Sequence, residues 1–309
     1  ITERMDGTKV RVATKYPKLD KVIKSDWNRV YVLGAMSGAG KSVTAKDLCD
    51  SIEEKNDVKP MFIYSNTEMI ASDTFKRSAV TKSGITLDVM DSEEEPISKE
   101  QYEYLKNVFN KLNNRDNLFF SDEITTPEKI IASLRFYYDT QCRNRNQPLV
   151  FIMDHSLLMA SSENLRSDKE KIDYLAVELI KLKKDVAKDG GRFIAYVLSQ
   201  LNRDIKKGER VKDPGQHGPT TSDLFASSFL EQGADAVIAV HIPFKCGLEQ
   251  YTMQNLPTMI NVNGEPLMMA YMHVIKNRHG PDGASLMKRW IKSFLNTYYS
   301  SIKLMEYVI

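Results

Sequence analysis

The sequence predicts an α/β fold in which a mostly parallel central sheet is flanked by helices. Short apolar runs with strand character alternate along the chain with helical patterns, which is the rhythm of such a sheet. One of these runs, Val30–Leu33, leads into a glycine-rich turn that opens a helix. Because ligands of parallel α/β sheets bind at the carboxyl ends of the strands, we expect the functional residues there.

The composition is that of a globular protein. The 309 residues are 42% apolar, and 43 basic against 41 acidic residues give a formal net charge of +2. A polyanionic partner would therefore have to bind a local basic patch, because the electrostatic field of the whole protein is weak. We expect residues 1–20 to form an N-terminal linker and residues 21–309 to form one domain.

The cysteines and the apolar segments indicate the cellular compartment of the protein. Cys49, Cys142 and Cys246 lie far apart and show no zinc-ligand spacing, a pattern typical of reduced thiols. No stretch approaches the roughly 20 apolar residues of a membrane helix, and the N-terminus lacks the pattern of a signal peptide. We therefore expect a cytoplasmic protein with no membrane partner.

The turn after the first strand has the composition of a phosphate-binding loop. Gly38 and Gly40 let the backbone approach a β-phosphate, and the helix that follows offers free N–H groups. Lys41 would neutralise the β- and γ-phosphates, and the Ser42 hydroxyl would bind Mg²⁺. The alternative is a solvated Gly/Ser loop. The nucleotide-binding candidates are the consecutive residues Ala35, Met36, Ser37, Gly38, Ala39, Gly40, Lys41, Ser42 and Val43.

One position of this loop departs from the usual pattern. Ala35 stands where such loops begin with glycine. We expect the turn to form nevertheless, because a small side chain fits it and Gly34 is adjacent.

The second strand is expected at Met61–Tyr64 and ends in Ser65–Met69. An acidic residue at the carboxyl end of a strand beside a phosphate loop can hold the water that attacks the γ-phosphate. Glu68 is the candidate for this role. The alternative is that Glu68 caps a helix that begins near Ala71, since acidic residues favour helix N-termini.

Residues 70–140 have helical patterns with polar connections, interrupted by a short strand at 117–120. The apolar run Leu149–Asp154 then ends in a carboxylate, which is typical of a central parallel strand that carries an acid on the Mg²⁺ side. Asp154 is therefore a metal-ligand candidate together with Ser42. A strand-ending Asp can also be a turn residue, so this hypothesis depends on the phosphate loop.

A capping box, Ser167–Glu170, opens a long amphipathic helix that ends at Gly190–Gly191. The strand Phe193–Leu198 follows, and Gln200 lies just beyond it, where we expect it close to a γ-phosphate. The predicted buried face of the helix consists of Ile172, Leu175, Leu179, Leu182 and Val186.

The polar stretch 204–221 is rich in glycine, proline and cations, among them Lys206, Lys207 and Arg210. Long loops in compact domains are usually functional or disordered. Contact with nucleic-acid phosphates and simple solvation remain equally open from composition alone.

Two further strands are expected at Ala236–Val240 and Leu267–Ile275, separated by an irregular stretch. The second is followed by Lys276–Pro281, in which two cations flank an asparagine before a Gly-Pro turn. Arginine at such a place can act as a finger on the γ-phosphate of a neighbouring subunit. The alternative for Arg278 is ordinary surface charge.

Six segments follow one another in the order and spacing of the DnaB-type replicative helicases, which the sequence resembles from about Val10 to Pro281. The segments are the phosphate loop, Ser65–Met69, Asp154–Met159, Ser199–Arg203, Ser222–Leu224 with Glu231–Asp235, and Lys276–Pro281. The resemblance implies a RecA-like ATPase domain that forms a hexameric ring on single-stranded DNA. It further implies ATP hydrolysis with Mg²⁺, translocation, duplex unwinding, and a primase or helicase loader as partner. The implied location is the nucleoid or, for a viral source, the host cytoplasm.

The family pattern also implies residue roles. It gives the phosphate-loop roles to Lys41 and Ser42, water activation to Glu68, the Mg²⁺-side acid to Asp154 and γ-phosphate sensing to Gln200. Lys276 and Arg278 become fingers that act on the next subunit. The family's DNA-binding loop falls on Phe225, Ala226, Ser227 and Ser228, and the cations of the neighbouring basic stretch, Arg203, Lys206, Lys207 and Arg210, are further DNA-binding candidates.

Two other functions stay open. One is a RecA-like recombinase or clock-type DNA-dependent ATPase that does not unwind duplex. The other is a loader or scaffold that uses nucleotide only to assemble, and the co-occurrence of Glu68, Asp154 and Arg278 argues against it.

Overall fold

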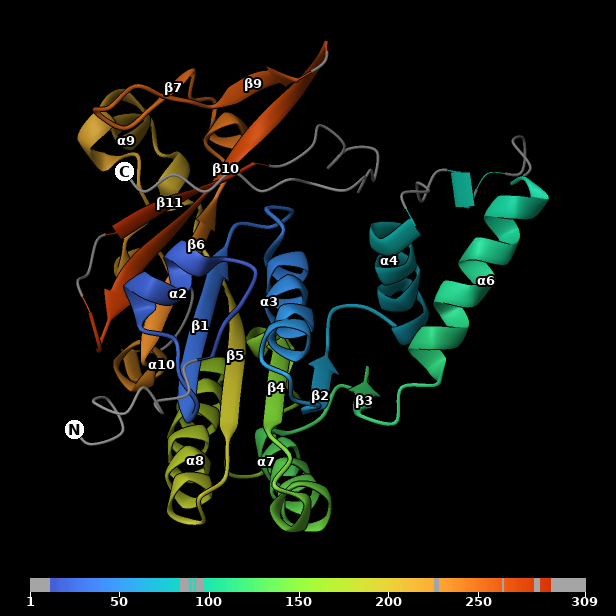
Figure 1. Ribbon diagram of the computed structural model, residues 1–309. Coiled ribbons are helices and arrows are strands. Elements are labelled where there is room, and N and C mark those ends of the chain that lie inside the picture. Colours follow the sequence, from blue (N-terminus) through green and yellow to red (C-terminus); the bar gives the residue numbers. More distant parts are fainter. Residues whose placement is uncertain are drawn as a thin grey trace, which may run out of the picture.

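A nine-stranded sheet runs through the centre of the molecule in the computed structural model (Figure 1). The structure describes residues 12–83, 89–90, 92, 97–224, 228–262, 264–280 and 284–289. The strand order is β11-β10-β6-β1-β5-β4-β2-β3, and β9 pairs with β10. The strands are β1 (Arg29–Ala35), β2 (Met61–Asn66), β3 (Leu118–Ser121), β4 (Leu149–Asp154), β5 (Phe193–Gln200), β6 (Ala236–His241), β9 (Met259–Val262), β10 (Glu265–Asn277) and β11 (Ala284–Arg289).

Strands β1 to β6 pair with one another in parallel, whereas β10 is antiparallel to β6 and to β11. The prediction of a mostly parallel α/β sheet is therefore confirmed. The helices are α2 (Pro17–Ile23), α3 (Lys41–Lys55), α4 (Ala71–Ser83), α6 (Lys99–Asn113), α7 (Pro127–Tyr137), α8 (Asp168–Lys188), α9 (Gly208–Lys212) and α10 (Ser228–Gly233).

The two faces of the sheet form separate halves of the core. Alternate residues of a strand point to opposite faces, so Val30 and Val32 of β1 pack in the half covered by α7 and α8. Tyr31 and Leu33 pack in the half covered by α2 and α3. The result is three layers with the sheet in the middle (Figure 1).

Helix α8 forms as its sequence predicts. The Ser167 hydroxyl accepts a hydrogen bond from the N–H of Glu170, whose carboxylate accepts one from the N–H of Ser167. All five residues of the predicted apolar face are buried, which anchors the helix on the sheet. The chain then returns to the sheet as β5 after Gly190–Gly191.

The parallel register brings four strand ends to one edge of the sheet. Ala35 at the end of β1 lies beside Gln200 at the end of β5. Asn66 at the end of β2 lies beside Asp154 at the end of β4. We call this side the carboxyl edge, and the opposite side, where β1 and β6 begin, the amino edge.

Peripheral elements extend beyond the three layers. Helices α4 and α6 lie beyond β3 (Figure 1) and share a small apolar cluster of Leu105 and Val108 with Phe75. Between β5 and α10 the chain forms short helical pieces, including η4 (Arg203–Lys206) and η6 (Thr221–Asp223). A further short helix, η7 (Pro243–Cys246), and the small hairpin of β7 (Gln250–Tyr251) and β8 (Leu256–Pro257) precede β9.

Two details concern the N-terminal segment and the residue before the phosphate loop. The boundary expected at residue 20 falls inside α2, and Val12, Tyr16 and Leu19 are buried in the core. Gly34, beside Ala35, lies within β1, and a Cβ atom there would approach Leu224 Cδ2 to 2.8 Å. Within the described residues, no helix is long and apolar enough to cross a membrane.

Candidate active site

The loop between β1 and α3 has the geometry of a phosphate-binding turn. Gly38 and Gly40 adopt left-handed conformations with φ of 68° and 80°, which favour glycine. The Ala39 N–H donates to the Met36 carbonyl at 3.0 Å and closes the turn. Lys41 then begins α3, so the unsatisfied N–H groups of the first helical turn face the loop.

Lys41 lies among the acidic candidates. Burial lowers the pKa of Lys41, and the negative charges of Asp154 and Glu68 act in the opposite direction. The three side chains come from α3, from the end of β4 and from the turn after β2. Tertiary structure thus brings together three residues that are distant in sequence.

Asp154 is 2% exposed, and its two carboxylate oxygens have different surroundings. The Tyr64 hydroxyl donates to Oδ2 at 3.0 Å. Burial, followed by the charge of Asp154, raises the pKa of Tyr64 and keeps this donor protonated. Oδ1 is buried and has no hydrogen-bond partner among the described residues. An orphaned carboxylate oxygen of this kind suits a hard cation such as Mg²⁺.

Glu68 is exposed at the carboxyl edge, on a turn that is fastened to β4. The Thr67 N–H donates to the Asp154 carbonyl at 2.6 Å, and the Thr67 hydroxyl donates to the His155 carbonyl at 2.9 Å. At the start of α4, the N–H of Ala71 donates to Asp122 Oδ2 at 2.7 Å. Asp122 therefore caps the first N–H group of α4.

Gln200 lies at the same edge, directly beside the phosphate loop. It is half-buried at the end of β5, in register with Ala35. The next residue, Leu201, donates its N–H to the Ala35 carbonyl at 2.9 Å. Gln200 is therefore adjacent to the start of the phosphate loop.

The segment Lys276–His279 lies at the other side of the sheet, the amino edge. Asn277 pairs with Ala236 at the start of β6, and the Arg278 N–H donates to the Asp235 carbonyl at 2.8 Å. Strand β1 has 7 residues and separates this edge from the phosphate loop by about 20 Å. The two cations of the segment are thus remote from Lys41 of their own chain.

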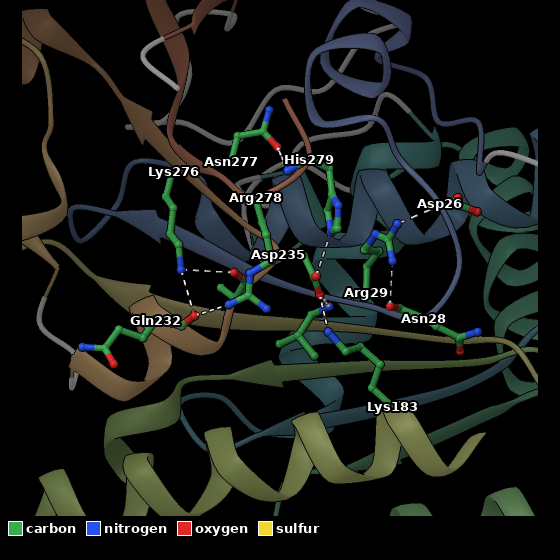
Figure 2. Close-up of polar contacts among 12 residues, drawn as sticks. Asp26, Asn28, Arg29, Lys183, Gln232, Asp235, Lys276, Asn277, Arg278 and His279 are labelled. Atoms are coloured by element: carbon green, nitrogen blue, oxygen red, sulfur yellow. Dashed lines mark hydrogen bonds and ion pairs between the residues drawn. The ribbon is translucent and has the colours of Figure 1, made fainter. Parts of the chain in front are cut away.

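Both cations are bound to the C-terminal end of α10 (Figure 2). The ammonium group of Lys276 donates to the carbonyls of Glu231, Gln232 and Ala234, and the Arg278 guanidinium donates to that of Gln232. Cations are favourable at a helix C-terminus, because the last carbonyls have no partner within the helix. In the single chain, α10 therefore holds both side chains.

A family model, the DnaB-like helicase C-terminal domain, matches residues 11–295. The chain belongs to this family. The replicative DNA helicase DnaB of Leifsonia xyli subsp. xyli (strain CTCB07) is 23% identical over 245 residues. That match covers 78% of this chain and 48% of the relative, so the DnaB-like chain spans about half the length of this curated relative.

Solved structures share the fold. The ATPase domain of G40P has a TM-score of 0.72 at 20% identity, with 97% of this chain and 95% of that one covered. A DnaB-like replicative helicase, described with its interactions with primase, has a TM-score of 0.70 at 20% identity, covering 94% and 62%. A KaiC-like protein from Pyrococcus horikoshii OT3 has a TM-score of 0.51 at 15% identity, covering 90% and 94%. The predicted RecA-like fold is confirmed.

The expected DNA-binding residues of the DnaB-like chain fall into two groups. Arg203, Lys206 and Lys207 are exposed on or beside η4, and Lys207 forms a surface ion pair with Asp204 at 3.0 Å. The loop residues Phe225, Ala226 and Ser227 lie outside the described residues, and Ser228 is the first residue of α10.

Arg210, the fourth cation expected to bind DNA, forms contacts within its own chain. Its side chain is 16% exposed, and its guanidinium forms an ion pair with the buried Asp223 at 2.5 Å. It also donates to the carbonyls of Gln216 and Gly218. These contacts hold the polar loop against η6.

Sequence reasoning missed Lys245. Its ammonium group, on η7, donates to the carbonyl of Gly38 in the phosphate loop at 2.6 Å. The next residue, Cys246, donates through Sγ to Met36 Sδ at 3.8 Å. No local pattern marks η7, because it lies in the stretch that the sequence leaves irregular.

Proposed function

We propose that this DnaB-like chain is the ATPase motor of a replicative DNA helicase that assembles as a hexameric ring, translocates on single-stranded DNA and unwinds duplex. The observation that carries the proposal is the separation of two half-sites within one chain. The carboxyl edge offers Lys41, Asp154, Glu68 and Gln200, and the amino edge offers Arg278. A ring in which one subunit's amino edge meets the next subunit's carboxyl edge would complete each site.

The carboxyl edge supports hydrolysis of a nucleoside triphosphate such as ATP. Glu68 would accept a proton from the attacking water, the new bond would form to the γ-phosphorus, and the bond to the β,γ-bridging oxygen would break to release the diphosphate. Lys41 and the N–H groups at the start of α3 would meet the negative charge of the phosphates. Gln200 would report the presence of the γ-phosphate.

Ser42 and Asp154 are the residues that would hold Mg²⁺. The orphaned Oδ1 atom of Asp154 fits that role, since Mg²⁺ prefers oxygen ligands. When bound, the ion would neutralise charge on the phosphate oxygens.

The amino edge supports action in trans. Arg278 is too remote to reach the phosphate loop of its own chain, so a γ-phosphate contact requires the site of a neighbouring subunit. The side chains of Lys276 and Arg278 would then leave the carbonyls of α10. Hydrolysis would be slow until subunits meet, because the charge that develops on the transferred phosphoryl group lacks this partner.

DNA would contact the side of the ring that carries Arg203, Lys206 and Lys207, with the segment 225–228. We propose a primase or a helicase loader as a further partner, because a structural neighbour is described with its interactions with primase. A cytoplasmic, nucleoid-associated location, or the host cytoplasm for a viral source, follows from this function.

Steady-state ATPase activity, with and without single-stranded DNA and over a range of protein concentrations, tests the proposal. We expect DNA to stimulate turnover and the rate per subunit to rise with concentration. Turnover that responds to neither would overturn the helicase assignment and favour another RecA-like ATPase. Strand displacement on a forked duplex separates a helicase from a recombinase or clock-type ATPase, and absence of any turnover would favour a non-hydrolysing scaffold.

A further inference from the structure

The backbone around Arg278 is held on both sides of the arginine, although the side chain itself is exposed. On one side, Asn277 Nδ2 donates to the Val22 carbonyl, just before the end of α2, at 2.8 Å. On the other side, the His279 N–H donates to Asn277 Oδ1 at 3.2 Å. The Arg278 N–H itself is bound to the Asp235 carbonyl.

Asp235 is the centre of these contacts (Figure 2). It is 2% exposed, and its Oδ2 accepts hydrogen bonds from the Val30 N–H at 2.9 Å and from Lys183 Nζ at 2.8 Å. Its Oδ1 accepts a hydrogen bond from His279 Nε2 at 3.0 Å. One buried carboxylate therefore joins β1, α8 and the segment that carries Arg278.

The charge state of Asp235 makes this a firm attachment. Burial alone would raise the pKa of Asp235, but the hydrogen bonds from Lys183, the Val30 N–H and His279 outweigh it and lower the pKa. The carboxylate therefore stays ionised, and charge-assisted hydrogen bonds are stronger than neutral ones. Breaking one of them at a buried site leaves the other groups underpaired.

We infer that Asp235 and His279 form a positioning pair that fixes the backbone of Lys276–His279, which we call the finger segment. Arg278 can then reach a neighbouring subunit's nucleotide from a defined point. This inference rests on the proposed function. The two attachments hold different parts of the segment. Helix α10 holds the side chains of Lys276 and Arg278, which must move to reach a neighbouring subunit, and Asp235 holds the backbone, which must stay in place. A displacement of about 1 Å at the origin of a catalytic group can cost roughly 100-fold in rate.

The first test is His279→Ala. His279 is about one-third exposed, and the substitution leaves the bonds of Asp235 to Val30 and Lys183 intact, so the fold should survive. We expect kcat for ATP hydrolysis to fall about 10- to 100-fold while the Kd for nucleotide stays near the wild-type value. His279→Gln should retain most of the activity, because its amide N–H can still donate to the carboxylate.

Mixed assemblies separate a positioning role from general damage. A Lys41→Ala subunit has no working phosphate site but presents an intact finger segment. When it is mixed with His279→Ala, sites on the His279→Ala subunits meet intact fingers and should recover turnover. A matched control is Lys181→Ala on α8, near Lys183 but paired with Glu178, which should behave as wild type.

The outcomes are distinguishable. Wild-type kcat for His279→Ala, or a loss that Lys41→Ala subunits do not rescue, would overturn the inference. The same mixing experiment with Arg278→Ala tests the proposed function separately. If Arg278→Ala is rescued and His279→Ala is not, the trans-acting site stands and the positioning pair falls. If Arg278→Ala is not rescued either, the proposed trans mechanism itself fails.

Discussion

The carboxyl edge of the sheet holds Lys41 and Asp154, whereas the amino edge holds the finger segment Lys276–His279. Each candidate at the carboxyl edge lies at the end of a strand, in the turn that follows a strand or at the start of a helix, so a short motif places it. The finger segment depends instead on Val22, Val30, Lys183 and Asp235, which lie far from it in sequence. Local motifs can therefore build a phosphate site, but the group proposed to complete it needs long-range support.

The largest effect is expected from Lys41→Ala at the carboxyl edge. Loss of the cation proposed to neutralise the β- and γ-phosphates should reduce ATP turnover by more than about 10³-fold and weaken nucleotide binding. Phosphate release under steady-state conditions measures it. Lys46→Ala is the matched control, since Lys46 is on the same helix and pairs with Asp50. Wild-type turnover in Lys41→Ala would remove the phosphate-site assignment.

At the amino edge, Arg278→Ala should lower turnover by about 10³-fold or more while nucleotide affinity stays close to wild type. The two edges would then differ in function, because only the carboxyl edge would contribute to nucleotide affinity. Nucleotide titration alongside single-turnover hydrolysis separates the two effects. Arg143→Ala, a surface arginine paired with Asp139 and Asp189, serves as control. An unchanged rate for Arg278→Ala would mean that the arginine is not a finger.

Acid should weaken the strand that leads to the finger segment before it affects Asp235. Burial lowers the pKa of His273 in β10 to about 4, from an ordinary value near 6.5. Between these values the unfolded chain binds a proton that the folded chain excludes, so stability falls as pH falls. The loss reaches up to about 3 kcal/mol at pH 4.

The contribution of Asp235 has a different pH window. Because its folded pKa is lowered, its stabilisation is present above the unfolded pKa and is lost only as pH falls through the folded value. Urea unfolding at several pH values measures both ranges. The His273→Gln variant should show a shallower decline between pH 6.5 and 4 than the wild type, and an identical slope would contradict the assignment.

The smallest effect is expected from Gly280→Ala. A Cβ atom there would lie 2.6 Å from the Val22 carbonyl oxygen and 2.6 Å from Asn277 Nδ2, so the turn after Arg278 must shift. We expect a loss of about 1–3 kcal/mol in unfolding free energy. Gly208→Ala in α9 is the control, since a Cβ atom meets nothing within 4 Å there. Equal thermal stability of the two variants would show that the finger turn tolerates displacement.

Local sequence determined most of the sheet, helix α8 and the nucleotide candidates. The apolar run 149–154 specifies a buried strand, the Ser167–Glu170 capping box specifies where α8 begins, and Gly38 and Gly40 specify the loop. These features follow from side-chain periodicity and backbone preference, which act over a few residues. The strands' shared direction then gathers Glu68, Asp154 and Gln200 at one edge.

Only the tertiary structure decided which edge carries Arg278 and what holds it there. The sequence indicates only that Arg210 is a basic loop residue, whereas in the structure its side chain is mostly buried in an ion pair with Asp223. Lys245 lies in a stretch for which the sequence predicts no regular structure, but its side chain contacts the phosphate loop. The N–H of Val30 binds the side chain of Asp235, 205 positions later. No local pattern encodes such pairs, because they exist only once strand order and register place distant segments side by side.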